Sequence, residues 1–134
     1  MPTKITTLKP LDPLKVFVEY DPQYEIYVAQ CLQTGHLVTA DDADMAKEMI
    51  AELLEDEVSS AVKHNDISRL LSNPAEMKLW LKFELALQTA PDKIDERTIR
   101  VVHSEVPQEL RLLLGQAEVE TLVSIVTGRT AKVA

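Results

Sequence analysis

The residue types that most often carry chemistry are few in this chain: a single cysteine, Cys31, and three histidines, His36, His64 and His103. A cysteine beside a histidine can act as a nucleophile with its general base. Cys31, however, sits in the apolar run EIYVAQCL, where a thiol is usually buried and unreactive. The histidines are far apart in sequence and lack the His-x-x-x-His spacing that presents two metal ligands on one helix face. We therefore expect no catalytic residue, no metal site and no cofactor.

A row of carboxylates is the second feature with possible chemistry. One helix alone cannot surround a cation with the six or more oxygen ligands that calcium prefers, so we expect no metal here either. Two interpretations stay open: an acidic face that only keeps the helix solvated, or a contact surface for a partner with a basic surface. The acids of this row are Asp44, Glu48, Glu52, Glu55 and Asp56.

Negative charge is concentrated around this row. The net charge is −8 over 134 residues, and residues 41–57 hold eight acids and a single base, Lys47. Binding to nucleic acid generally needs clustered Lys and Arg that contact phosphates, so this balance argues against a general nucleic-acid binder. With 46% hydrophobic residues the chain can bury one core. A single cysteine, and no apolar run long enough for a signal peptide or a membrane span, indicate a cytoplasmic protein outside membranes.

A long amphipathic helix over residues 42–64 is expected to position the acids. Asp41 or Asp42 can cap its first turn by accepting a backbone N–H that has no helical partner. No Gly or Pro interrupts the run, and its apolar residues recur at steps of three and four. These apolar positions are Ala46, Met49, Ile50, Leu53, Val58, Ala61 and Val62.

Strands are expected to form the layer on which this helix packs. Prolines indicate an extended arm over residues 1–13. Alternating apolar residues then predict strands near 15–20, 25–32 and 36–39, the first two joined as a hairpin. Residues 78–87 also alternate strictly, which favours a fourth strand, although their residue types would permit a helix.

The stretch from the hairpin into the helix, about residues 14–64, resembles the N-terminal domain of HicB-like antitoxins. That family typically reads Leu-Pro-Gly-Cys, three residues, then Gly-Asp-Thr and a helix with an early Glu-Ala. The matching positions here are Gly35, Asp41 and Ala46, and Leu32 lies one residue before the position of the Leu. The departures are Thr34 for the Pro, His36 for the Cys, Ala40 for the second Gly, Asp42 for the capping Thr and Met45 for the Glu.

This resemblance implies a non-enzymatic protein that binds and masks a small basic ribonuclease toxin. The acidic row is our expected contact for such a partner, because a basic surface and an acidic surface are electrostatically complementary.

The C-terminal segment has a different pattern. After a linker expected over residues 89–95, alternation predicts a strand over 96–103. Helices are predicted over 107–114 and, from apolar spacing of three and four, near 119–126. A strand followed by two helices is the order of a ribbon-helix-helix DNA-binding unit. In such a unit Thr98, Arg100 and Val102 would face the major groove.

Charge weakens that DNA-binding interpretation, because residues 91–134 hold seven acids and six bases. The alternative is that this segment completes the core or forms a dimer interface. Its apolar stripe is large for so small a piece, so we expect a homo-oligomer, most simply a dimer.

Together these patterns predict an α+β fold in which a small antiparallel sheet packs on one long helix. The expected organisation is an arm over 1–13, the HicB-like domain over 14–88, the linker, and a strand-helix-helix segment over 96–134. The leading functional hypothesis is antitoxin-like binding of a basic protein. The alternatives are a DNA-binding regulator and an acidic inhibitor that mimics nucleic acid.

Overall fold

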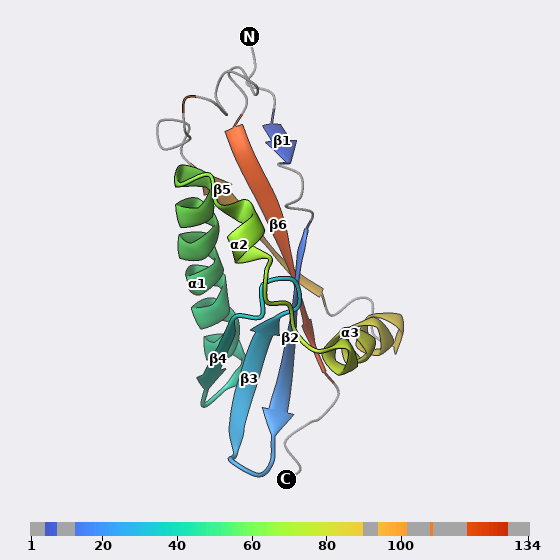
Figure 1. The fold of residues 1–134 in the computed structure, drawn as a ribbon. Helices are drawn as coiled ribbons and strands as arrows, with labels where there is room; N and C mark the ends of the chain where they lie inside the picture. The colour runs from blue at the N-terminus through green and yellow to red at the C-terminus, as the bar shows by residue number, and fades with distance from the viewer. Residues whose placement is uncertain (1–4, 8–12, 90–93, 102–107, 109–117, 129–134) are drawn as a thin grey trace.

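The computed structural model describes residues 5–7, 13–89, 94–101, 108 and 118–128. The first half of the chain forms the strands β1 (Ile5–Thr7), β2 (Leu14–Asp21), β3 (Ile26–Cys31) and β4 (Leu37–Ala40) and the helix α1 (Ala43–Lys63). The second half forms the helices α2 (Ile67–Leu70) and α3 (Met77–Thr89) and the strands β5 (Ile94–Val101) and β6 (Glu118–Thr127). An α+β fold is therefore confirmed, with both helical layers built on one sheet (Figure 1).

The sheet is mixed rather than purely antiparallel. β2 pairs with β3, and β3 with β4, in antiparallel register. β6 pairs with β5 in antiparallel register and with β1 and β2 in parallel register. β5 pairs with one side of β6 over most of the length of β6. On the other side of β6, β1 pairs with its first residues and β2 with its later residues. β6 is thus an inner strand, and the strands predicted near 15–20, 25–32 and 36–39 are confirmed.

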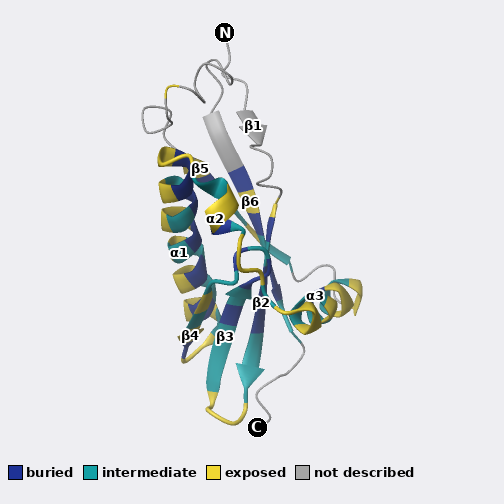
Figure 2. Ribbon diagram, in the orientation of Figure 1, coloured by how far each residue is buried: buried dark blue, intermediate teal, exposed yellow. Residues whose placement is uncertain are grey.

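One face of the sheet is covered by α1, as the sequence predicts. Its apolar side packs on inward-facing residues of the strands, among them Val16, Val18, Val123 and Ile125. Figure 2 shows that the buried positions of α1 lie toward the sheet. Successive strand residues point to opposite faces, so these alternate residues all reach the helix. The α1 residues buried in this core are Ala46, Ile50, Leu54, Val58, Ala61 and Val62.

The opposite face carries α3, where a strand was predicted over 78–87, and this prediction is wrong. Phe83, the buried residue of α3, packs with Phe17, Leu32 and Val126. The apparent alternation arises because the apolar residues of this helix lie on all of its sides. A spacing of two residues can therefore be found among them as easily as one of three or four. Leu81, part of the alternating set, is 64% exposed. The residue types of this segment, rich in Leu, Lys, Met, Ala and Glu, favour a helix.

The second correction concerns residues 119–126, where a helix was predicted and the structure has β6. The spacing of Val119, Leu122, Val123 and Val126 fits a helix, yet the segment is dominated by β-branched residues that suit a strand. Burial follows a period of two, with Thr121, Val123 and Ile125 all buried on the α1 side. The strand-helix-helix order is therefore wrong in its last element.

Several smaller expectations have mixed outcomes. The strand expected over 96–103 is present as β5, and the expected linker over 89–95 is partly α3 and partly β5. The expected arm contains β1, and most of the helix expected over 107–114 lies outside the described residues. No helix in the described part of the chain is long and apolar enough to cross a membrane.

Candidate interaction surface

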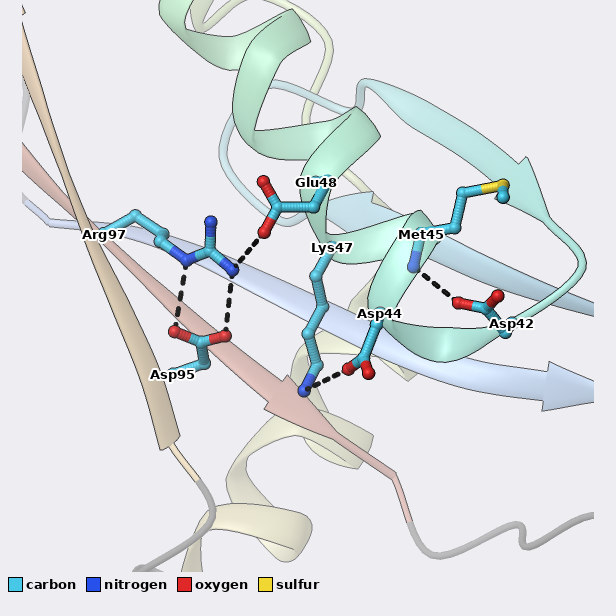
Figure 3. Close-up of polar contacts among 7 residues, drawn as sticks. All are labelled: Asp42, Asp44, Met45, Lys47, Glu48, Asp95 and Arg97. Carbon is cyan, nitrogen blue, oxygen red and sulfur yellow. Dashed lines mark hydrogen bonds and ion pairs between the residues drawn. The ribbon is translucent and has the colours of Figure 1, made fainter.

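The acidic row lies on the exposed part of α1, between its outer side and the side next to β5. α1 begins with Asp42, whose carboxylate accepts the backbone N–H of Met45 at 2.7 Å (Figure 3). This contact satisfies a donor that the first turn of a helix leaves unpaired, so it fixes where the helix starts. All five acids of the row, which the sequence predicts as the partner contact, are exposed, from Asp44 to Asp56.

Two of the five acids are engaged with bases. Asp44 lies 3.9 Å from Lys47, one turn away on the same helix. Glu48 reaches across to β5, where its Oε1 lies 2.7 Å from a guanidinium nitrogen of Arg97 (Figure 3). Arg97 also donates to Asp95 of its own strand, at 3.2 Å from both Nε and Nη2. Glu48 therefore ties α1 to β5.

Arg97 is the electrostatic centre of this contact. Hydrogen bonds to Glu48 and Asp95 raise the pKa of its guanidinium further above the ordinary range. In return, the hydrogen bond from Arg97 lowers the pKa of Glu48 and that of Asp95. All three groups remain charged at neutral pH, and the bridge joins the helix to the sheet.

The other three acids, Glu52, Glu55 and Asp56, have no basic partner among the described residues. Beside them on the solvent side of α1 lie Met45 and Met49, whose relative exposures are 48% and 40%. A methionine is flexible and polarisable, and it adapts to differently shaped apolar partners. Carboxylates and thioether side chains thus share one exposed surface of α1.

The residues predicted to contact DNA lie elsewhere. Thr98 and Arg100 are exposed on β5 and point to the face of the sheet away from α1. Val102 lies outside the described residues. β5 is paired with β6 of its own chain, and β6 takes the place of the second helix of a ribbon-helix-helix unit. Residues 118–128 therefore do not form the second helix on which the DNA-binding prediction rests, and DNA binding itself stays a prediction.

A pocket that sequence reasoning missed lies between the end of α1, α2 and the turn joining β3 to β4. Its volume is about 690 Å³. The turn between β3 and β4 contributes Gly35 to the lining of the pocket. The φ of Gly35 is +78°, a conformation that favours glycine. A Cβ at this position would also collide with the backbone carbonyl oxygen of Asn73. The pocket is lined by Thr34, Gly35, His36, Glu57, Ser60, Ala61, His64, Asp66, Arg69, Leu70 and Asn73.

Two of the three histidines, far apart in sequence, line this pocket. His64 Nδ1 lies 2.9 Å from the backbone oxygen of Ser60, which can only accept, so Nδ1 carries the proton. His36 Nδ1 lies 2.8 Å from Thr34 Oγ1, and its Nε2 lies 3.7 Å from a carboxylate oxygen of Glu57. The pocket therefore offers hydrogen-bond donors and acceptors, and both acidic and basic side chains line it. No signal within the sequence places His36 beside α1.

Cys31 is buried, and it is not among the residues that line this pocket. Burial raises the pKa of the Cys31 thiol, which keeps it neutral. Among the described residues, no group of three or more His, Cys, Asp or Glu side chains is arranged to hold a metal ion. Comparison of the chain with protein-family models, with curated proteins and with solved structures finds no match.

Proposed function

We propose that this protein is a non-enzymatic binding protein that recognises a basic protein partner through the acidic face of α1. The observation that carries the proposal is the set of three exposed acids, Glu52, Glu55 and Asp56, without a base among the described residues. An exposed carboxylate next to an exposed methionine can contribute charge complementarity and apolar contact to the same partner.

The local architecture of residues 14–64 supports the likeness to HicB-like antitoxins stated above. A hairpin, a turn with Gly35 at positive φ, a short strand and an acid-capped helix follow in the expected order. Ala40, which replaces a glycine of the family pattern, ends β4 and pairs with Tyr27 as an ordinary strand residue. By this resemblance, we expect the partner to be a small basic ribonuclease toxin, which this protein would mask by binding to it.

The test begins with affinity purification of the tagged protein from its own cells, with and without nuclease, followed by mass spectrometry. We expect one small basic protein in a ratio near one to one, retained after nuclease. Recovery that disappears with nuclease, or recovery of no basic protein, would contradict the proposal.

Charge reversal then maps the contact. The triple variant Glu52→Lys, Glu55→Lys and Asp56→Lys should lose the partner while its unfolding transition remains cooperative. A matched control reverses three exposed acids elsewhere, Glu25, Glu76 and Glu84, and changes the net charge equally. If both variants bind the partner equally well, the acidic face of α1 is not the contact.

A further inference from the structure

The outer edge of β5 is the longest strand edge left open by the described part of the sheet. β5 runs over eight residues, and β6 is the one described strand that pairs with it. From Ile94 to Ile99 it contains neither Pro nor Gly, so its backbone can accept another strand on the side away from β6. The strand at the opposite side of the sheet, β4, has only four residues.

Acids of α1 border this edge. The contact between Glu48 and Arg97 shows that the side of α1 carrying Glu48 lies next to β5 (Figure 3). Asp44 precedes Glu48 by four residues and Glu55 follows it by seven, so the helical repeat puts all three on this side. The side chains of Asp44 and Glu48 are 96% and 58% exposed.

Solvent reaches the space between this side of α1 and β5. The side chains of Arg97 and Asp95, which lie there, are 32% and 34% exposed. A strand added to β5 would run about 4.8 Å further out, with every second side chain on the α1 face of the sheet. Those alternate side chains would meet Asp44, Glu48 and Glu55, so Lys or Arg would suit them best.

A second copy of this chain fits the edge poorly. Two β5 strands paired about a twofold axis would place both α1 helices on the same face of the joined sheet. Their acidic sides would then face each other, and like charges in register repel. The charges of α1 therefore select a basic strand over another copy of β5.

We propose that β5 accepts an extended segment of the partner as an additional strand, and that this segment has a basic residue at every second position. This inference rests on the proposed function, since it specifies how the basic partner is held. Backbone hydrogen bonds along Ile94–Ile99 would provide affinity, and the acids of α1 would select the alternating charge.

A peptide of eight residues, the length of β5, tests the proposal directly. The probe is fluorescein-labelled, with Lys at every second position and Thr or Val between, and binding is read by anisotropy. One comparison peptide has the same composition with the lysines in adjacent pairs, so that they fall on both faces. Another is N-methylated at alternate residues, which removes backbone donors on one side. We expect each comparison peptide to bind at least about tenfold more weakly.

Hydrogen exchange and matched variants locate the site. The alternating peptide should slow amide exchange within β5 and leave β4 unchanged. The double variant Asp44→Lys and Glu55→Lys, which keeps the bridge between Glu48 and Arg97, should lose binding. The control Glu25→Lys and Glu76→Lys has the same net charge and should retain it.

The outcomes separate this inference from the proposed function. Equal binding of all three peptides, abolished by reversing Asp44 and Glu55, would overturn strand pairing while leaving the acidic face as the contact. Absence of peptide binding, or protection at β4 instead of β5, would also overturn strand pairing. The proposed function itself fails if purification from cells recovers no basic partner, if that recovery disappears with nuclease, or if reversing Glu52, Glu55 and Asp56 leaves binding of the partner unchanged.

Discussion

α1 and α3 cover opposite faces of the same sheet, and they differ in what they present to solvent. α1 has one apolar side, buried on the sheet, and an outer side rich in carboxylates. α3 buries Phe83 but leaves Met77, Leu81 and Leu85 at least 64% exposed (Figure 2). The period of a helix can be read from sequence when its two sides differ in polarity. α1 meets this condition and α3 does not.

The largest effect is expected in the core beneath α1. Leu54 is fully buried there, within the larger of the two core clusters, so Leu54→Ala should lower the free energy of unfolding by about 4 kcal/mol. Urea denaturation followed by circular dichroism measures this change. If Leu54→Ala lowered the free energy of unfolding no more than a substitution at an exposed residue does, the packing of α1 would not stabilise the main core.

A smaller effect is expected beneath α3. Phe83 belongs to a separate cluster with three other buried residues. Because this cluster is small, Phe83→Ala should lower the free energy of unfolding by about 3 kcal/mol, the low end for a buried Phe. Hydrogen exchange should show α3 opening before α1 in this variant. Leu81→Ala, on the exposed side of the same helix, is the control and should change stability by less than about 0.5 kcal/mol. Equal costs at Phe83 and Leu81 would mean that both sides of α3 are covered.

The N-cap of α1 should contribute less again. Asp42→Ala removes the acceptor for the backbone N–H of Met45 and should cost about 1 kcal/mol. Asp41→Ala removes the neighbouring carboxylate, and we expect a change of a few tenths of a kcal/mol at most. The two variants are compared by thermal unfolding, and a reversed order would place the cap at Asp41.

The smallest effect concerns the bridge between α1 and β5, and it depends on pH. Arg97 lowers the pKa of Glu48 and of Asp95 below their ordinary values of 4.5 and 3.8. Each carboxylate therefore stabilises the fold above its ordinary pKa, and this contribution disappears as pH falls through the lower folded pKa. The stability difference between wild type and Arg97→Gln should be greatest near pH 7 and narrow below about pH 4.5. A difference that stays constant down to pH 3 would contradict this linkage.

The comparison of the two helices also explains what the sequence could reveal. The hairpin, β4 and α1 have clear periods and local turn or cap residues, so their positions follow from nearby residues alone. The apolar residues of β6 fit a helical spacing as well as a strand spacing, and its β-branched composition and its place between β2 and β5 favour a strand. The acids of α1 could be found from their spacing. The bridge to Arg97 and the position of His36 and His64 in one pocket depend on tertiary contacts, which spacing does not encode.

The inner position of β6 has a consequence for synthesis of the chain. Leu14 of β2 pairs with Val123 of β6, so the sheet cannot close until the C-terminal region has left the ribosome. Until then β2 lacks this neighbour, and the nascent chain carries a hydrophobic strand with one unpaired edge. Contacts so distant in sequence also slow folding. A chain shortened before β6 should therefore aggregate rather than fold into a smaller version of the same sheet.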